Sequence, residues 1–519
     1  MSKSNKATKS AVTIIIFTLG SKFLGFLREV LIAAKFGSGV EVDTFVIALS
    51  AAGLIGGFIT SAINTTFIPV ISEVESKEGK EGKIDHTNNM INVIFIISIV
   101  LTILALIGAP LLIKLLASGF EGDQFDLAVN LTRIGLPTLL FSGIIGIMTG
   151  YLQSEEKFKA TALIGFPMNF VYITFLIFFS KYFGIKGLMV VSVLATLSQL
   201  LIQLPEAKNT GFKYKFKIDL KDKYLKRILY LSMPVFLGVA IGDLNAVVDK
   251  TLASSLVEGS ISALNYSLRL NSLISGVFIT AITTVVFPLI SKEANSNNID
   301  GVKSIMAYGF NLILLITVPA TIGIIVLSTP IVQIVFQRGR FDSVATMMTS
   351  SALVYYSLVL VASSLRLLIT KVYYALQDTK TPMINGAISV ALNIIFNFIL
   401  IKPMAHAGLA LATSISTTIA TIILLYGLKK KIGSLGTKGY IITFIKTGLA
   451  SAIMGIVAYV VYHGLYGILG VSKLYNLISL LVAVVLAVIV YGVLCYLFGI
   501  EEVRDIVDKV VKRLKLKKL

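Results

Sequence analysis

The chain has 519 residues, of which 56% are hydrophobic and 14% are charged, and its formal net charge is +19. Its mean hydropathy of +0.88 lies far above that of soluble globular domains and indicates a protein that crosses a membrane many times. Cys495 is the single cysteine, which excludes disulfides within the chain and a thiol-rich metal site.

Apolar runs of about 18–25 residues recur along the whole length, and each is long enough to cross a bilayer as a helix. The runs are continuous and lack the two-residue alternation of a membrane barrel. We therefore predict an all-α polytopic membrane protein with about fourteen transmembrane helices. Their expected centres lie near residues 23, 55, 102, 140, 170, 195, 238, 276, 320, 358, 392, 418, 452 and 486.

The lysine-rich loops predict the orientation. With the N-terminus inside, fourteen spans place the basic segments 3–9, 76–83, 208–227, 428–438 and 511–519 on one side, which is then cytoplasmic together with both termini. The net charge therefore reflects topology and attraction to anionic membrane lipids, and it requires no nucleic acid. The last segment, 501–519, has apolar positions at helical spacing and is expected to be a basic amphipathic tail, or alternatively a disordered one.

The first apolar run, from Ala11 to about Lys35, contains Lys22, Arg28 and Glu29. Each such charge costs roughly 2.5–3.5 kcal/mol at the bilayer centre, so these residues are expected to face water or a partner. At 3.6 residues per turn they share one helix face with several small or polar residues, and Asp43 follows at the start of the next run. This face comprises Thr18, Ser21, Lys22, Gly25, Arg28 and Glu29.

Three segments recur in the same order about 220 residues apart: 58–72 and 278–291, 151–170 and 374–398, and 184–196 and 405–417. An even number of spans per repeat gives two parallel lobes around a central cavity, which suits alternating access. We expect a first six-helix lobe with its linker at 1–225 and a second lobe at 226–436. The last two spans, at 437–500, lie outside the repeat, and the tail follows at 501–519.

A second polar face repeats at i, i+4, i+7 and i+11 in the eighth span, with Asn265, Arg269, Ser272 and Gly276. If the repeat relates the lobes, Lys22, Arg28 and Arg269 face each other across the cavity. Their surplus positive charge favours an anionic ligand, and the arginine fork matches phosphate or pyrophosphate oxygens. Alternatively, Arg28 pairs with Glu29 or Asp43 and only holds helices together.

Oxygen-bearing side chains on later spans could bind Na⁺, because hard cations take carboxylate, amide and hydroxyl ligands. These are Asp249, Asn393, Asn397 and Thr413, and hydrogen bonding between helices is the alternative interpretation. The chain lacks a G-x-x-x-x-G-K-[ST] nucleotide-binding loop, so transport would draw on an ion gradient or the membrane potential.

Several motifs together resemble the bacterial lipid II flippase MurJ (MviN) family of the multidrug/oligosaccharidyl-lipid/polysaccharide exporter superfamily. They include GSKFLGFLREVLIAAKFGSGVEVDTFVIAL at 20–49, YSLRLNSLISGVFITAI at 266–282, VFQRGRF at 335–341, YYALQDTKTP at 373–382 and HAGLALATSIST at 406–417. The resemblance implies fourteen helices and movement of lipid II from the inner to the outer leaflet. It also implies that the last two helices form a groove for the polyprenyl tail.

The resemblance carries over to individual site residues. Ser21, Gly25, Arg28 and Glu29 match the family's S-R-x-x-G-x-x-R-[DE] cavity signature, with Lys22 in place of the first arginine. Asp43 and Arg269 match further cavity residues, whereas Ile55 and Gly56 stand where an Arg-Arg pair is frequent. Asp249, Asn393, Asn397 and Thr413 match the family's ion-site positions, and Asn397 replaces an acid there.

The sequence thus predicts a transporter and not an enzyme, located in the bacterial cytoplasmic membrane. Lipid II is the expected substrate, with anionic lipids and cell-wall synthesis proteins as further partners. Three alternatives stay open: a flippase for another undecaprenyl-pyrophosphate-linked polysaccharide unit, a cation-coupled exporter, which should have an acidic cavity, and a structural scaffold for wall assembly.

Overall fold

The structure is a computed structural model that describes residues 3–470, 472–505 and 508, and within these residues it contains helices and no strand. The side chains of 3–15, 58–59, 61–65, 234–241, 243 and 277 lie outside the description. The chain divides into two compact units. Unit 1 comprises Met1–Ser262 and Arg338–Asp342, and unit 2 comprises Ala263–Gln337 and Ser343–Leu519.

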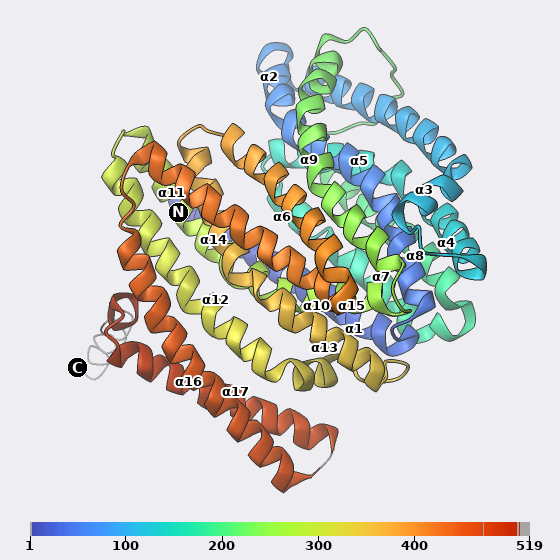
Figure 1. The fold of residues 1–519 in the computed structure, drawn as a ribbon. Helices are drawn as coiled ribbons and strands as arrows, with labels where there is room; N and C mark the ends of the chain where they lie inside the picture. Colours follow the sequence, from blue (N-terminus) through green and yellow to red (C-terminus); the bar gives the residue numbers. More distant parts are fainter. Residues whose placement is uncertain (1–2, 471, 506–507, 509–519) are drawn as a thin grey trace. The chain divides into compact units, whose positions relative to one another are not determined.

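Unit 1 contains nine helices and the first turn of a tenth (Figure 1). They are α1 (Lys3–Phe36), α2 (Val40–Ile107), α3 (Ala109–Leu116), α4 (Gly122–Gly135), α5 (Thr138–Ser154), α6 (Phe158–Ala162), α7 (Gly165–Phe178), α8 (Ser180–Asn209) and α9 (Lys223–Ser254).

The long helix α2 consists of two arms, because Gly79 has a φ of 72° and breaks it. The arms fold back on each other, since His86 after the break bonds to Glu78 before it at 2.8 Å. Their apolar faces form one core with α5, in which Phe67, Met90 and Tyr151 are buried. Burial of these faces holds the hairpin together.

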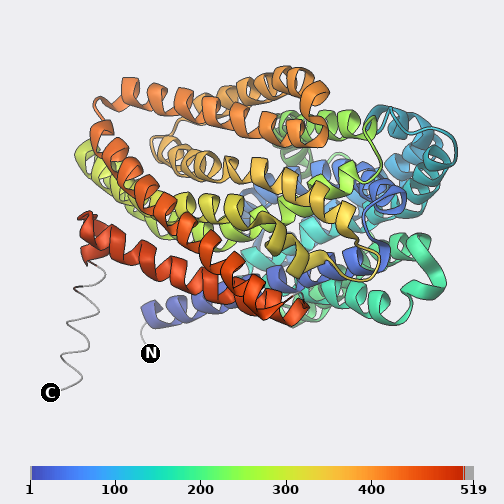
Figure 2. The ribbon, with the colours of Figure 1, turned by 60° about the horizontal axis from the view of Figure 1, so that its bottom comes forward.

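Unit 2 starts within α10 and ends with two long apolar helices. Its elements are α10 (Ser260–Ile274), a π-helical turn η1 (Ser275–Ile279), α11 (Thr280–Asn295), α12 (Ile299–Phe336), α13 (Ser343–Ser357), α14 (Val359–Ala375), α15 (Lys380–Ile432), α16 (Thr437–Leu469) and α17 (Lys473–Leu497). Figures 1 and 2 show α16 and α17 side by side as a helical pair, which packs on α12.

The α15 segment is also a hairpin. Ala405 has a φ of 48° and interrupts the helix, and Asn385 before the break donates to the carbonyl of Ala420 after it at 2.8 Å. Such a positive φ is unusual for a residue with a side chain. Its counterpart in unit 1 is Gly184, 221 residues earlier, with a φ of 54°.

A second pair of unusual backbone positions has the same separation. Glu156 and Gln377, 221 residues apart, have φ values of 58° and 59°. Both end a helix before a short turn, after α5 in unit 1 and after α14 in unit 2. The repeat found in the sequence is therefore also present in the backbone.

Eight helical segments are long and apolar enough to cross a membrane, or ten if each of two bent pairs forms one span, within the described residues. The α15 hairpin counts once among them, so dividing it at Ala405 adds one more. Three further predicted spans fall on α1, α9 and the α10–η1–α11 run, whose side chains are only partly described. The arrangement is consistent with the predicted fourteen.

The boundary between the compact units differs from the predicted lobe boundary at 225/226, because α9 packs with unit 1. Lys250 Nζ donates to Ser50 Oγ at 2.6 Å, and Arg227 pairs with Glu73 at 2.7 Å, so α9 is bonded to α2 along its length. At the other end of the chain, residues 501–505 are helical, and most of the predicted tail 501–519 lies outside the described residues.

Candidate functional site

Two of the predicted site residues, Ser21 and Gly25, lie where α1 contacts α7. Asn169 of α7 donates its amide to the carbonyl of Ser21 at 3.2 Å and to that of Gly165 at 2.8 Å. A Cβ atom on Gly25 would lie 3.7 Å from the Asn169 side chain. Small residues allow two membrane helices to approach this closely. Ser21 and Gly25 therefore serve helix packing in this conformation.

Arg28 lies on the same contact, one turn further along α1. Its Nη2 donates to Glu29 Oε1 at 2.9 Å, and its guanidinium lies 4.8 Å from the ring centroid of Tyr172 in α7. The side chain is 16% exposed, and its Nε is buried without a hydrogen-bond partner. Of the two interpretations of Arg28, the pairing with Glu29 is the one present in this structure.

Lys22 differs from Arg28 in that its side chain is exposed. It precedes Arg28 by six residues, which corresponds to roughly 9 Å along a helix. The adjacent Phe23 is also exposed, at 67%. The polar face of α1 thus has an accessible cation at one end and an ion pair at the other.

Asp43 lies in the first turn of α2 and is 2% exposed. Its two carboxylate oxygens accept hydrogen bonds from the backbone N–H groups of Gly259 and Ser262, both at 2.7 Å. These groups begin α10, so the carboxylate satisfies donors that a helix start leaves open and complements the positive end of its dipole. The contact makes Asp43 a positioning residue for α10.

Arg269 lies on α10 in unit 2, where two flanking residues anchor the helix to α13. Ser267 donates to the carbonyl of Thr349 at 2.7 Å, and Asn271 donates to that of Tyr356 at 2.8 Å. Both anchors are buried, whereas Arg269 between them is exposed. The predicted convergence of Lys22, Arg28 and Arg269 involves both units, and it stays a prediction.

The polar residues of the possible ion site divide between the units. Asp249 is half-buried in α9 of unit 1, and the other three lie on the α15 hairpin of unit 2. There Asn397 donates to Asn393 Oδ1 at 2.8 Å, Asn393 donates to Thr413 Oγ1 at 3.2 Å, and Thr413 donates to the carbonyl of Leu409 at 3.1 Å.

These three residues form a chain of hydrogen bonds between the two arms of the hairpin. The Asn393 amide oxygen and the Thr413 hydroxyl oxygen accept from neighbouring side chains, and the group contains no carboxylate. A hard cation prefers carboxylate and unoccupied oxygen ligands. The hydrogen bonds within the hairpin match the alternative interpretation, and an ion site that also includes the Asp249 carboxylate of unit 1 stays a prediction. The described residues also contain no group of three or more His, Cys, Asp or Glu that could hold a metal.

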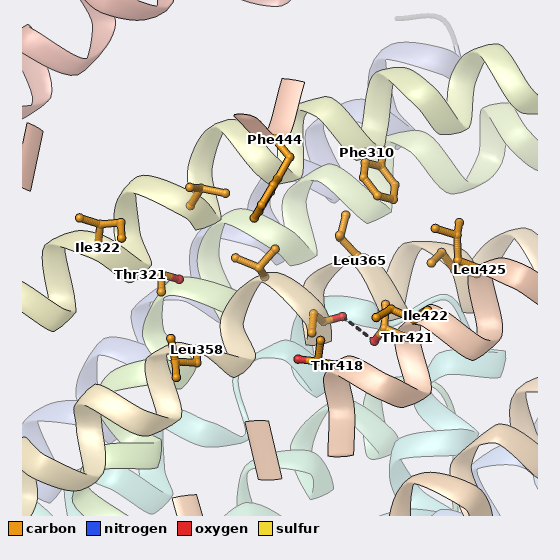
Figure 3. Close-up of a pocket in the computed structure, with 14 residues that line it drawn as sticks. Phe310, Thr321, Ile322, Leu358, Leu365, Thr418, Thr421, Ile422, Leu425 and Phe444 are labelled. Atoms are coloured by element: carbon orange, nitrogen blue, oxygen red, sulfur yellow. Dashed lines mark hydrogen bonds between the residues drawn. The ribbon is translucent and has the colours of Figure 1, made fainter. Parts of the chain in front are cut away.

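Unit 2 contains an apolar cavity of about 440 Å³ (Figure 3). Its few polar groups are internally satisfied: the Thr421 hydroxyl donates to the carbonyl of Ala362 and that of Thr321 to the carbonyl of Ser357, both at 3.1 Å. Such a lining suits a hydrocarbon chain and not a charged headgroup. The lining residues come from α12, α14 with the residue before it, α15 and α16. They are Phe310, Val318, Thr321, Ile322, Leu358, Val361, Ala362, Leu365, Ile369, Thr418, Thr421, Ile422, Leu425 and Phe444.

The tail groove predicted for the last two helices stays a prediction. In the structure, α16 contributes Phe444 to this cavity, and α17 contributes none of its lining residues. The α17 helix packs instead on α16 and α12 in a separate cluster that includes Tyr462 and Ala483.

Sequence reasoning did not single out Asn169 and Tyr172. Both are buried on α7, and they contact Ser21 and Arg28, respectively. They stand three residues apart in the otherwise apolar run GFPMNFVYITF, at the spacing of one helix face. That spacing was the available signal for a polar contact with another span.

Comparison with known proteins identifies the family. Residues 32–495 match the family described as lipid II flippase MurJ, which covers most of the chain. The chain belongs to the lipid II flippase MurJ family. A probable lipid II flippase MurJ from Haemophilus influenzae is 30% identical over 460 residues, which span 85% of this chain and 90% of that protein. The lipid II flippase MurJ of Burkholderia cenocepacia is 24% identical over 459 residues, covering 86% and 89%.

Solved structures agree with this assignment. A lipid II flippase MurJ in an inward closed conformation matches with a TM-score of 0.78 and 29% identity, covering 93% of this chain and 99% of that one. An inward-facing multidrug resistance MATE transporter of the MOP superfamily matches with a TM-score of 0.69 and 14% identity, over 82% and 99%. At this identity, the second match shows the fold alone.

Proposed function

We propose that this MurJ-family chain is a flippase that moves lipid II from the inner to the outer leaflet of the bacterial cytoplasmic membrane by alternating access. The observation that carries the proposal is the exposure of Arg269 between two buried anchors on a membrane helix. An exposed arginine on a membrane helix is accessible to an anionic ligand, and its guanidinium matches phosphate oxygens. The relatives are named as lipid II flippases, and lipid II is an anionic substrate.

Lys22 and Arg269 would provide the first contacts to the pyrophosphate, because both side chains are exposed. Arg28 would bind the pyrophosphate only after its ion pair with Glu29 breaks, because in this conformation the guanidinium is bonded to Glu29. Such an exchange is feasible because the new partner is also an anion and accepts hydrogen bonds from the guanidinium, which bonds to Glu29 through Nη2 alone. Asp43 would contribute indirectly, by fixing the start of the helix that carries Arg269.

The polyprenyl tail would occupy apolar surface of unit 2, and the cavity next to Phe444 is suited to part of it. Its polar lining groups are already bonded within the protein, so only hydrocarbon gains from entering. The charged headgroup and the apolar tail would thus bind to chemically distinct parts of the protein.

The energy source would be an ion gradient or the membrane potential, with both termini in the cytoplasm. The Asn393 and Thr413 oxygens already accept hydrogen bonds from neighbouring side chains, so no step is assigned to Na⁺. Further partners would be anionic lipids and cell-wall synthesis proteins, and the chain would act as a transporter without catalytic chemistry.

Complementation tests the proposal. A bacterium depleted of its own lipid II flippase should grow when it expresses this chain and should fail with Arg269→Ala or Arg28→Ala. Arg133→Ala is the matched control, because Arg133 is an exposed arginine of α4 outside both polar faces. Growth with all variants would reject the cationic site and favour a scaffold, whereas no growth with the unmodified chain would favour another polyprenyl-linked polysaccharide as substrate.

A further inference from the structure

The connection between α8 and α9 includes an extended segment, residues 212–221, with the sequence FKYKFKIDLK. We refer to it as the strap. It belongs to unit 1, and in Figure 1 it is part of the loop beside the N-terminal end of α9. Its first residue, Phe212, packs against the core of the α2 hairpin at the ring of Tyr151.

Three asparagines of α2 hold the backbone of the strap. Asn88 donates to the carbonyl of Lys213 at 2.9 Å, and Asn92 donates to those of Lys215 and Lys217 at 3.2 and 3.0 Å. Asn89 donates to the carbonyl of Asp219 at 2.9 Å and accepts from its N–H at 2.7 Å. All three asparagines are buried. The strap is therefore fixed in an extended form and is not a loose tether.

Large side chains of the strap are exposed, although the Tyr214 hydroxyl donates to Asn92 Oδ1 at 2.6 Å and so points back to α2. The exposed fractions are 61% for Tyr214, 78% for Phe216, 42% for Ile218 and 65% for Leu220. Lysines alternate with them at 213, 215 and 217, with a further lysine at 221, and Asp219 is the only acid of the segment. An exposed row of large side chains on a fixed backbone indicates a surface that is covered by lipid or by a protein partner.

The position of the strap indicates whether lipid or a protein covers it. Asn92 marks the end of the clamped region on α2. Val93 and Ile94 after it are buried in the core, and the exposed apolar residues start with Phe95 at 37% and Ile96 at 42%. One helical turn is about 5.4 Å, so the strap lies about one turn from the surface that faces the hydrocarbon. At its other end Asp222 caps α9, where Tyr230 is 79% exposed.

We propose that the strap is a membrane-docking element that binds the anionic lipid surface of the leaflet nearest to it. Tyr214 and Phe216 would enter the headgroup layer, where aromatic rings are favoured, and the lysines would pair with lipid phosphates. Within the described residues, Asp85 lies 3.2 and 3.7 Å from Lys215 and Lys217, so this single carboxylate balances two lysines and leaves the strap positive. Charge and position together favour a lipid surface over a protein strand.

The chain contains no tryptophan, which permits a site-specific test. Phe216→Trp gives one fluorophore on the strap of the full-length protein, reconstituted in vesicles of phosphatidylcholine with or without one quarter phosphatidylglycerol. Two matched probes bracket it: Glu81→Trp on the exposed turn of α2, and Ile103→Trp on the exposed apolar surface of the same helix, which is 51% exposed at that residue.

Brominated lipids should quench Phe216→Trp to an extent between the two probes, with a blue-shifted emission, and phosphatidylglycerol should increase the quenching. Replacing Lys213 and Lys221 by glutamine in that background should remove the increase, whereas Lys77→Gln should not. If the emission of Phe216→Trp has the same long wavelength and the same lack of quenching as that of Glu81→Trp, the proposal is overturned. The strap would then be a candidate for binding a protein strand. Quenching that does not depend on phosphatidylglycerol or on the lysines also overturns the proposal.

Discussion

Asp43 and Ser262 are 219 residues apart in the chain, yet the carboxylate of Asp43 accepts a hydrogen bond from the backbone N–H of Ser262 at 2.7 Å. The bond ties the start of α2 to the start of α10, the helix that carries Arg269 further along. A buried acid that the sequence assigns to the substrate thus has a structural task in this conformation. Its removal should affect folding as well as transport.

Asp43→Ala should lower the free energy of unfolding by about 2 kcal/mol, because it leaves two buried N–H groups without an acceptor and removes a helix cap. Thermal unfolding in detergent measures the change. Glu41→Gln is the control, since Glu41 pairs with Arg340 at 2.7 Å on an exposed surface. A surface pair contributes less than about 1 kcal/mol, and equal losses in both variants would contradict the capping role.

Lys83→Met should destabilise unit 1 by about 3 kcal/mol. The lysine side chain is fully buried, and its ammonium bonds to Glu75 at 2.7 Å and to Glu155 at 2.5 Å. Among the described residues, its loss leaves the largely buried Glu155 carboxylate with only the more distant Lys80, at 3.7 Å. Lys77→Met removes an exposed ion pair with Glu73 and should cost less than about 1 kcal/mol. The free energy of unfolding of both variants at neutral pH tests this. A smaller loss for Lys83→Met than for Lys77→Met would refute the prediction.

Asp378 should make stability depend on pH in the acidic range. The hydrogen bond from Lys431, followed by that from the backbone N–H of Thr381, lowers the pKa of Asp378 from 3.8 to about 2. Because the folded pKa is the lower one, the ionised carboxylate stabilises the fold above pH 3.8, and this contribution is lost as pH falls toward 2.

Asp378→Asn should therefore melt below the unmodified protein at neutral pH, and the difference should shrink as the pH falls toward 2. Asp300→Asn serves as control, because the Asp300 side chain is 94% exposed. A difference between Asp378→Asn and the unmodified protein that stays constant from neutral pH to pH 2 would disagree with this account.

Sodium should not stabilise the chain. With Asn393 and Thr413 bonded to neighbouring side chains, exchanging K⁺ for Na⁺ should shift the melting temperature by less than about 1 °C. Asn397→Asp should create a Na⁺-dependent increase, since it adds a carboxylate beside Asn393, whereas Asn385→Asp, elsewhere on the same hairpin, should not. A clear Na⁺ effect on the unmodified protein would contradict this prediction and support the predicted ion site.

The sequence was informative about helices and repeats because membrane spans leave long apolar runs. Windows of hydropathy located the spans, and the matched segments predicted a repeat that Gly184 and Ala405 now show in their backbone angles. The separate spans predicted near residues 392 and 418 imply a break between them, but the positive φ at Ala405 had no sequence signal, because alanine favours helices.

The site was predictable only in part. Helical periodicity placed Lys22, Arg28 and Glu29 on one face, but it could not distinguish the exposed lysine from the arginine that pairs with its neighbour. The role of Asp43 could not be predicted, because its partners are the backbone N–H groups of Gly259 and Ser262. Every residue except proline has such a group, so the amino-acid sequence does not show which of them bind a carboxylate. The strap, too, read only as a basic linker.

The central claim is that exposed cations of the two polar faces bind the pyrophosphate of lipid II during transport. The most direct test is the rate at which lipid II crosses the bilayer of vesicles that contain the purified chain, Lys22→Ala, Lys22→Arg, Arg269→Ala or the control Arg133→Ala. Loss of one charge-assisted contact corresponds to roughly tenfold in rate. We expect the two alanine variants of the polar faces to be slower by at least that factor, and Lys22→Arg and Arg133→Ala to retain transport; equal rates for all five proteins would contradict the claim.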